Sequence, residues 1–333
     1  MKNKPIILVA GEPKSIFFEI FFKAIKKKNY KSPLVLVCCK KLLLQQMRRY
    51  QFKKVLKILT INELKYTNLN NKSINLIDKR SLKTSNKKKQ DKFVKIYISE
   101  SFKLAFQLIK DGFTRKLING PINKKTFLNK KFLGVTEYIS KEFKQKKTGM
   151  IIYNKRLSVC PLTTHLPIKL VAKKITKKLI EEKIEIINSF FKKIFKINPK
   201  IAVTGINPHC ETILKFNEDD KIVYSAIKTK IKKGINVKGP YPADTVFLRK
   251  NREKFDVILG MYHDQVLTPF KTLFEYDAIN ITMGLPFLRV SPDHGPNQEM
   301  YGKNKSNPQS LIKALEFLDN KWLKPKKVSD KIF

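Results

Sequence analysis

The sequence Phe255-Asp-Val-Ile-Leu-Gly-Met-Tyr-His-Asp-Gln-Val-Leu-Thr-Pro-Phe-Lys271 decides how the rest of the chain is interpreted. Its apolar run Val257-Ile-Leu is typical of a buried strand, and Gly260 ends that strand before a turn that contains His263. The same order of strand, turn and histidine occurs twice more, at His165 and at His209. Three of the four histidines are therefore expected just beyond the ends of strands.

Strands and helices are predicted to alternate along the rest of the chain. Ile6 to Ala10 and Ser32 to Cys38 carry apolar runs typical of buried strands, and each precedes a predicted helix. The clearest helix, Thr176 to Lys196, connects two of the strands that precede histidines, which is the arrangement of a βαβ crossover. The polar stretch from Leu64 to Lys92 is expected to be a surface connection, with or without edge strands. This alternation predicts an α/β fold, and a length of 333 residues favours two domains.

Basic residues dominate the composition, because 70 Lys and Arg against 27 Asp and Glu give a formal net charge of +43. Such a charge raises the hypothesis of a polyanion partner. Only eight of the basic residues are Arg, however, and the lysines are spread along the whole chain. Nucleic-acid surfaces instead concentrate Arg and aromatic side chains in one patch. We therefore expect a solvated basic surface and no specific nucleic-acid partner.

The cysteines and the apolar segments of the chain indicate the cellular compartment of the protein. The four cysteines include no Cys-x-x-Cys pair, which favours reduced thiols. The amino terminus has too short an apolar run for a secretory signal, and no window approaches the roughly 20 apolar residues that span a bilayer. These features predict a cytoplasmic protein that does not associate with membranes.

Three histidines at strand ends suit a metal site better than one histidine would. A single histidine is more often a structural residue than a ligand, so the argument depends on His165, His209 and His263 together. In open α/β sheets, ligands bind at the carboxyl ends of the strands. Neutral imidazoles prefer zinc and similar ions to magnesium, and three protein ligands leave positions open for substrate. The residues alone leave a three-histidine metal site and structural histidines equally open.

Groups suited to an anionic substrate lie near these strands. Lys271 comes eight residues after His263, and Asn280 and Arg289 accompany the next predicted strand. Arg can bind phosphate or carboxylate bidentately, and Lys supplies a point charge. A loop rich in proline presents Asp244, either as a functional group or as part of a rigid turn. No Gly-x-Gly occurs, so the dinucleotide fingerprint of Rossmann folds is absent.

Six short motifs resemble those of the 4-hydroxythreonine-4-phosphate dehydrogenases of pyridoxal phosphate biosynthesis, and they occur in the same order as in that family. The resemblance runs from Gly11-Glu-Pro13 to Asn307-Pro308 and so covers nearly the whole chain. The motifs are Asn119-Gly-Pro-Ile-Asn-Lys124, Thr163-Thr-His-Leu-Pro167, Asn207-Pro-His209, Gly239-Pro-Tyr-Pro-Ala-Asp-Thr245, Met261-Tyr-His-Asp-Gln265 and Gly284-Leu-Pro-Phe-Leu-Arg-Val-Ser-Pro-Asp-His-Gly295.

The resemblance implies a fold and a reaction. The fold would be isocitrate/isopropylmalate-dehydrogenase-like, with a cleft between two α/β domains: residues 1–125 with 291–333, and residues 126–290, which would carry the metal ligands and the dimer interface. The enzyme would use NAD or NADP and a divalent ion to oxidise the 3-hydroxyl of 4-phosphooxy-L-threonine. The β-keto acid would then lose CO2 to give 3-amino-2-oxopropyl phosphate. The family forms homodimers with a shared active site.

The resemblance also implies roles for individual residues. The metal ligands would be His165, His209 and His263, and the ion would be zinc or else cobalt, nickel, manganese or magnesium. The substrate-binding residues would be Thr136, Lys271, Asn280 and Arg289. Lys271 and Asp244 would be catalytic, and His294, Gly295 and Asn307 would bind the cofactor.

This sequence departs from the family pattern at three places. Where the family has Gly-His-Thr-Glu, this chain has Gly134-Val-Thr-Glu137, so Val135 replaces a substrate-contacting histidine. In the first turn, Ser15, Phe17 and Phe18 stand where the family has two glycines and a proline. Pro296-Asn-Gln-Glu299 replaces the expected Thr-Ala-x-Asp. The last change bears on cofactor affinity, because in the wider dehydrogenase superfamily that loop approaches the adenosine half of the cofactor.

Two further hypotheses follow from these departures. Related dehydrogenases act on phosphorylated four-carbon acids such as phosphothreonate, and Val135 is compatible with such a change of substrate. The other hypothesis is a protein that keeps the fold and the metal without catalysis, or that binds polyanions through its charge.

Overall fold

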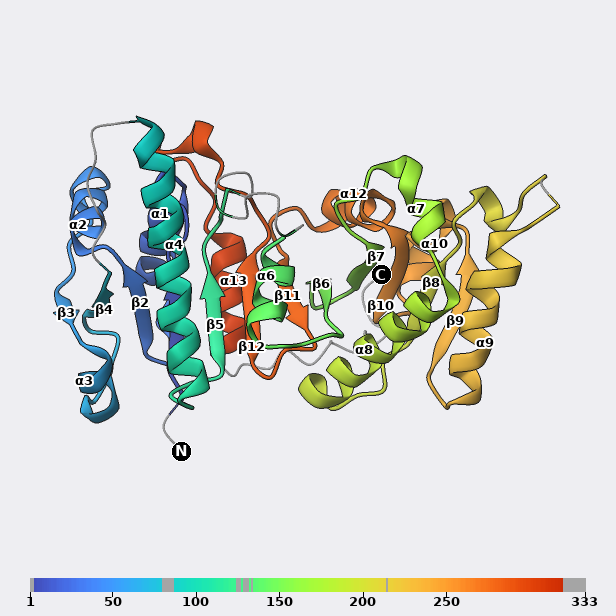
Figure 1. Ribbon diagram of the computed structural model, residues 1–333, viewed down its shortest axis with the longest axis horizontal. Helices are drawn as coiled ribbons and strands as arrows, with labels where there is room; N and C mark the ends of the chain where they lie inside the picture. Colours follow the sequence, from blue (N-terminus) through green and yellow to red (C-terminus); the bar gives the residue numbers. More distant parts are fainter. Residues whose placement is uncertain are drawn as a thin grey trace, which may run out of the picture. The chain divides into compact units, whose positions relative to one another are not determined.

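The computed structural model describes residues 3–79, 87–123, 127, 132, 134–213 and 215–319. Helices and strands alternate through these residues (Figure 1), so the predicted α/β class is confirmed. The chain forms two compact units and passes from one to the other at 139/140 and again at 284/285. The sequence prediction places these divisions at 125/126 and 290/291.

The first unit contains a parallel sheet whose strands are neighbours in the order β3, β4, β2, β1, β5, β12. The strands are β1 (Ile6–Val9), β2 (Leu34–Cys38), β3 (Leu56–Ile58), β4 (Ile74–Asp78), β5 (Lys116–Asn119) and β12 (Leu288–Pro292). The helices are α1 (Phe17–Lys27), α2 (Lys40–Arg49), α3 (Ile61–Tyr66), α4 (Lys87–Lys110), the 3-10 turn η3 (Gln298–Met300) and α13 (Gln309–Leu318). A further helix, α6 (Val135–Glu142), spans the division at 139/140.

The stretch from Leu64 to Lys92 is not only a surface connection. It contains β4, which lies between β2 and β3 in the sheet and has buried residues from Ile74 to Ile77. The polar residue in this strand, Asn75, is fully buried, and its Nδ2 donates to the carbonyl oxygens of Leu34 and Asn70 at 2.9 and 2.8 Å. Backbone acceptors therefore satisfy the amide inside the sheet.

Helix α1 packs closely against the ends of β1 and β5. Phe17 and Phe21 stack with ring centroids 5.9 Å apart, and both side chains are buried. Gly120, just after β5, leaves no room for a side chain, because a Cβ there would lie 2.6 Å from Phe17 Cδ2 and 2.2 Å from Ala10 O. The two phenylalanines that depart from the family pattern, Phe17 and Phe18, are thus core residues of this unit.

The second unit contains a mixed sheet in the order β11, β6, β7, β10, β8, β9. The strands are β6 (Gly149–Tyr153), β7 (Ser158–Thr163), β8 (Ile201–Thr204), β9 (Val237–Tyr241), β10 (Val257–Tyr262) and β11 (Ile279–Met283). β7, β10, β8 and β9 run parallel, while β6 is antiparallel to both β7 and β11. The helices are α7 (Ile168–Lys174), α8 (Lys177–Phe195), the 3-10 turn η1 (Pro208–Cys210), the π-helical turn η2 (Asp219–Tyr224), α9 (Ser225–Lys232), α10 (Ala243–Val246), α11 (Arg249–Arg252) and α12 (His263–Phe274).

The predicted crossover is present in this unit. α8 follows β7 and precedes β8, and both strands pair in parallel with β10 between them. The apolar positions that predict the helix, including Ile180, Ile184 and Ile187, are fully buried. The sequence pattern therefore identifies both the helix and the face that packs inward.

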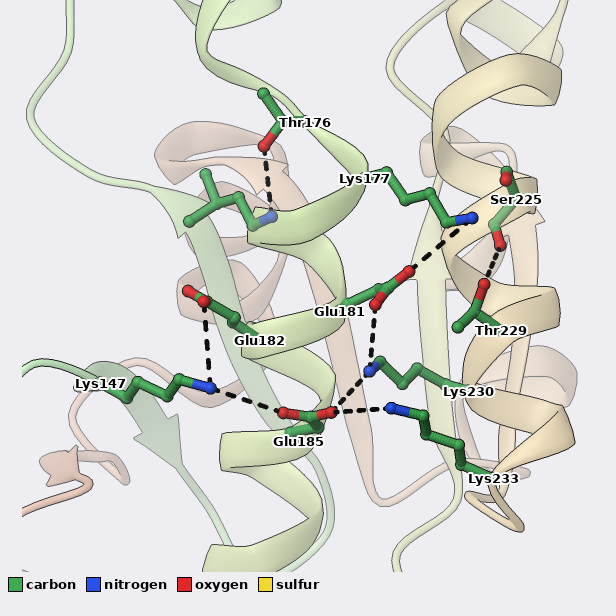
Figure 2. Close-up of polar contacts among 11 residues, drawn as sticks. Lys147, Thr176, Lys177, Glu181, Glu182, Glu185, Ser225, Thr229, Lys230 and Lys233 are labelled. Carbon is green, nitrogen blue, oxygen red and sulfur yellow. Dashed lines mark hydrogen bonds and ion pairs between the residues drawn. The ribbon is translucent and has the colours of Figure 1, made fainter.

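A network of charges ties α8 to α9 (Figure 2). Lys230 Nζ lies 2.6 Å from Glu185 and 3.2 Å from Glu181, and only 2 % of its side chain is exposed. Glu185 also lies 3.9 Å from Lys147 and 4.0 Å from Lys233. Glu181 also lies 4.0 Å from Lys177, so each of these carboxylates has more than one lysine partner, and the network holds α9, which follows η2 directly, against the crossover helix.

None of the helices in the described part of the chain combines the length and apolar character needed to cross a bilayer.

Candidate metal centre and substrate-binding residues

The three histidines follow three neighbouring parallel strands. His165 comes two residues after β7, His263 directly after β10, and His209 five residues after β8. Because β7, β10 and β8 are adjacent and parallel, their carboxyl ends lie at one edge of the sheet. The crossovers of the α/β fold thus bring segments of the chain that are far apart in sequence to the same edge.

Two of the histidines are close to each other. The ring centroids of His165 and His263 are 5.9 Å apart, with an angle of 37° between the rings. Two imidazoles that share one zinc ion, with Zn–N bonds of about 2.0–2.1 Å, would place their ring centres roughly 5–6 Å apart. His263 Nδ1 lies 2.6 Å from Asp264 Oδ1, an arrangement that orients the ring and leaves Nε2 as the nitrogen for a ligand. The pair fits a shared divalent ion in chemistry and in spacing.

Within the described residues, His209 does not complete a metal-binding group with this pair. Over the described residues, no three His, Cys, Asp or Glu side chains are grouped so that they could hold a metal ion. The backbone at His165 and at His209 nevertheless has φ of 56°, in the left-handed region that non-glycine residues rarely adopt. Such strained residues concentrate at functional sites because the surrounding structure must hold them there. The role of the three histidines as ligands stays a prediction.

A buried carboxylate, not predicted from the sequence, supports the loop that carries His209. Asp219, in the π-helical turn η2, is fully buried and accepts hydrogen bonds from the backbone N–H groups of Ile206 and Asn207 at 2.7 and 3.1 Å. The Nδ2 of Asn207 adds a further bond to Asp219, at 3.1 Å. A run of three acidic residues beginning at Glu218, in a chain so poor in them, was the available sequence signal.

Asp244, predicted to be catalytic, is electrostatically close to the His209 loop. It lies exposed in α10, after the cis peptide bond between Gly239 and Pro240. Burial raises the pKa of the Cys210 thiol to about 11, and the negative charges of Asp219 and Asp244 add to this rise. The Asp244 carboxylate is therefore near the residue that follows His209.

The other two predicted residues of this unit lie on α12 and β11. Lys271 is exposed in the last turn of α12, about 12 Å along the helix axis from His263 at 1.5 Å per residue. Asn280 is half-buried in β11, and its Nδ2 donates to Met150 Sδ at 3.2 Å. Asn280 Oδ1 is buried, and no donor among the described residues bonds to it. An unsatisfied buried acceptor is unfavourable, so a ligand donor at this position would stabilise the structure.

Thr136 and Arg289 belong to the first unit. Arg289 in β12 is 3 % exposed, and its Nε donates to Asn119 Oδ1 at 2.7 Å. Burial lowers the pKa of Arg289 to about 10, and the charge of Glu137 partly opposes that change, so the guanidinium remains protonated at neutral pH. Thr136, in the first turn of α6, is the neighbour of Glu137. A buried cation of this kind suits an anionic ligand.

The predicted cofactor residues follow β12. His294 Nδ1 lies 3.0 Å from Gly295 O, and Asn307 Oδ1 accepts a hydrogen bond from the backbone N–H of Gln309 at 2.9 Å, at the start of α13. The two loops that depart from the family pattern touch each other, because Ile16 N donates to Pro296 O at 3.2 Å. The changes in the two loops are therefore structurally linked. Lys124, in the first motif, lies outside the described residues.

Glu12, in the Gly11-Glu-Pro13 turn, is a further polar residue whose environment the sequence does not reveal. It is 7 % exposed, and its buried Oε2 has no hydrogen-bond partner in the part of the chain that the structure describes. Burial raises the pKa of this carboxyl, although a hydrogen bond with the backbone of Asn123 opposes the rise. The motif marked the position, but only the fold shows that the carboxyl is buried.

Comparison with known proteins finds similarity along most of the chain. Residues 30–318 match the family model described as pyridoxal phosphate biosynthetic protein PdxA. A 4-hydroxythreonine-4-phosphate dehydrogenase from Sulfurihydrogenibium is 36% identical over 320 residues, which cover 93% of this chain and 96% of that protein. A D-threonate 4-phosphate dehydrogenase from Salmonella typhimurium is 29% identical over 328 residues, covering 95% and 98%. The crystal structure of the 4-hydroxythreonine-4-phosphate dehydrogenase from Klebsiella pneumoniae matches with a TM-score of 0.80 at 27% identity, over 95% of this chain and 98% of that one.

Proposed function

The chain belongs to the family of the pyridoxal phosphate biosynthetic protein PdxA, and we propose that it catalyses the dehydrogenation of 4-hydroxythreonine 4-phosphate for which its relatives are named. In this reaction the 3-hydroxyl of the substrate is oxidised with NAD or NADP and a divalent ion. Loss of CO2 from the resulting β-keto acid gives 3-amino-2-oxopropyl phosphate.

One structural observation carries the proposal. His165, His263 and His209 follow the carboxyl ends of three adjacent parallel strands, where ligands bind in open α/β sheets. A divalent ion bound by the close pair His165 and His263, with His209 as the proposed third ligand, would supply Lewis acidity at the substrate hydroxyl, and a bound nicotinamide would accept the hydride.

The other predicted residues divide the remaining tasks. The buried guanidinium of Arg289, oriented by Asn119, would bind the phosphate or carboxylate of the substrate. Asn280 Oδ1 would accept a hydrogen bond from the ammonium or hydroxyl group. Lys271 would add positive charge near the anion, and Asp244 would accept the proton of the reacting hydroxyl. Held in place, the substrate would present its C3 hydrogen to the cofactor.

The direct test is an assay of purified protein with 4-phosphooxy-L-threonine, NAD or NADP, and each of Zn²⁺, Co²⁺, Mn²⁺ and Mg²⁺ in turn. We expect reduced nicotinamide and CO2 in equal amounts. His209→Ala should lose bound metal and turnover together. Failure to form reduced nicotinamide with any ion, by protein that is folded and metal-loaded, would refute the proposal.

A second candidate substrate is D-threonate 4-phosphate, which carries a hydroxyl in place of the amino group. Two observations favour its inclusion: the relative from Salmonella typhimurium that is named for it, and Val135 in place of a substrate-contacting histidine. Comparison of kcat/KM for the two substrates decides between them. If the residue at this position distinguishes the two substrates, Val135→His should shift the ratio of the two kcat/KM values toward 4-phosphooxy-L-threonine.

We also propose a homodimer with a shared active site. Large apolar side chains are exposed in the second unit, where Ile168, Ile213 and Phe216 are 69%, 104% and 53% exposed. Exposed apolar residues are frequent at protein–protein interfaces. Light scattering with size-exclusion chromatography should give twice the mass of 38.8 kDa. Phe216→Asp should favour the monomer, whereas a monomeric wild-type protein at micromolar concentration would exclude the dimer.

Cofactor binding is proposed for His294, Gly295 and Asn307, and either NAD or NADP is compatible with these residues. Support comes from their place in the family motifs and from their position after β12. Calorimetric titration with NAD and with NADP measures which of the two dinucleotides binds more tightly. Asn307→Ala should weaken binding of the preferred cofactor. An unchanged dissociation constant for that cofactor would show that Asn307 is not part of the site.

A further inference from the structure

One glutamine side chain joins two strand ends that carry predicted metal ligands. Gln265 lies in the first turn of α12, two residues after His263. Its Oε1 accepts hydrogen bonds from the backbone N–H of Met261 and from the hydroxyl of Thr204, each at 2.7 Å. Its Nε2 donates to the carbonyl oxygen of Gly205 at 2.8 Å. A single side chain thus uses both its acceptor and its donor to connect β10 with the loop after β8.

These bonds begin where the backbone pairing of the two strands ends. The ladder between β10 and β8 reaches the pair Leu259 and Val203 and goes no further. Thr204 ends β8 and Gly205 follows it, and these two residues begin the path to His209. Beyond the ladder, the side chain of Gln265 takes over the connection between the two chain segments.

The loop is restricted on its other side as well. Asp219 holds the backbone of Ile206 and Asn207, as described above. At Gly205 a Cβ would lie only 2.6 Å from Cys210 Sγ and 2.9 Å from Asp219 Oδ1. The segment that leads to His209 is therefore held between Asp219 and Gln265.

We propose that Gln265 is a positioning residue for the metal centre, and that its hydrogen bonds to Thr204 and Gly205 set the place of the His209 loop relative to His263. The inference rests on the metal centre of the proposed function. Gln265 bonds to the segments that carry two ligands and to neither imidazole, so its effect is on the geometry of the ligands. Outer-sphere groups that orient metal ligands typically change metal affinity by about 10- to 100-fold.

The test uses two substitutions at this position. Gln265→Met keeps the length of the side chain and removes all three hydrogen bonds, while Gln265→Glu keeps the acceptor and replaces the donor that faces Gly205 O. The dissociation constant for Zn²⁺ is measured on metal-stripped full-length protein, by competition with a chromophoric chelator. The visible absorption of bound Co²⁺ reports the coordination geometry. We expect zinc binding to weaken by about 10- to 100-fold in Gln265→Met and less in Gln265→Glu, with an altered Co²⁺ spectrum in both.

Gln46→Met is the matched control. Gln46 is a buried glutamine of the first unit, and its Nε2 donates to the hydroxyl of Tyr301 at 2.8 Å. This variant should lose stability and retain the wild-type affinity for Zn²⁺. If Gln265→Met does not fold, Thr204→Val removes one of the same hydrogen bonds from the side of β8 and should weaken zinc binding severalfold.

The outcomes separate the inference from the proposal on which it rests. Wild-type zinc affinity and Co²⁺ spectra in folded Gln265→Met and Gln265→Glu, together with lost zinc binding in His209→Ala, would overturn the role of Gln265 and leave the metal centre in place. Unchanged zinc affinity in His209→Ala would remove the metal centre itself, and the role of Gln265 with it.

Discussion

Lys230→Met is expected to destabilise the second unit by about 2 kcal/mol. Removing one partner of a fully buried ion pair costs about 3–5 kcal/mol. Lys230 is almost fully buried, but the side chains of its partners Glu185 and Glu181 are 36% and 20% exposed, and each retains another lysine at 3.9–4.0 Å. Water and the remaining lysines therefore recover part of the cost. Methionine keeps the packing of the aliphatic stem.

The assay is thermal unfolding combined with hydrogen exchange. For a unit of this size, a loss of about 2 kcal/mol corresponds to a fall in Tm of roughly 4–8 °C. Faster exchange should be confined to peptides from α8, α9 and η2, which the network connects. Lys233→Met is the matched control, because Lys233 is 61% exposed and 4.0 Å from Glu185, and it should cost less than about 0.5 kcal/mol.

The difference in the free energy of unfolding between Lys230→Met and the wild type should also depend on pH. The hydrogen bond from Lys230 lowers the pKa of Glu185 below its ordinary value of 4.5, so this contribution is present above pH 4.5 and is lost as the pH falls. Burial by itself lowers the pKa of Lys230, but its bonds to Glu185 and Glu181 outweigh burial and raise it above 10.5. The lysine contribution is present below pH 10.5 and is lost above it. Equal losses in Lys230→Met and Lys233→Met at neutral pH would refute the reasoning.

Three other substitutions test further buried charges. Arg289→Lys should raise KM for the phosphorylated substrate by about 10- to 100-fold in steady-state assays, because lysine cannot bind an anion bidentately; an unchanged KM would contradict the assigned role. Glu12→Gln should stabilise the protein by on the order of 1 kcal/mol in urea unfolding at pH 8 and have no effect at pH 4. The reason is that burial raises the pKa of Glu12, so ionisation above pH 4.5 disfavours the folded state; a variant less stable at pH 8 would show that the charge is needed. Lys116→Met should be neutral or stabilising by up to about 1 kcal/mol at pH 7, because burial lowers the pKa of Lys116 and the charged form is disfavoured in the fold; a clear loss of stability would show that its 3.2 Å bond to Ser32 dominates.

The sequence predicts those features of the fold that depend on short-range patterns. The run Val257-Ile-Leu and the spacing of Ile180, Ile184 and Ile187 identify β10 and the inward face of α8, because burial imposes those periods. β4 is not recognisable, because Asn75 interrupts its apolar run and is satisfied by carbonyl groups that only the folded sheet provides.

The same distinction applies to the candidate site. The sequence places the histidines beyond strand ends, but it does not show which of them approach one another. The close pair of His165 and His263 depends on the adjacency of β7 and β10, which are separated by nearly 100 residues of chain. The path of the loop that leads to His209 depends on hydrogen bonds from Ile206 and Asn207 to Asp219, which lies 12 or 13 residues further along the chain. Site geometry of this kind follows from long-range packing and is therefore the last feature to be read from a sequence.

The distribution of acidic residues explains why the net charge of +43 need not indicate a polyanion partner. Asp219, Asp319 and Glu19 are each 5% exposed or less, and each accepts a hydrogen bond from the backbone N–H of a residue at least 12 positions away in the sequence. A lysine or an amide could not replace a carboxylate that accepts two backbone donors. Exposed positions carry no such requirement, so they can accumulate lysine without disturbing the loops. In the part of the chain that the structure describes, four acidic residues, Glu12, Glu19, Asp219 and Asp319, occupy buried positions, and the excess of positive charge belongs to the surface.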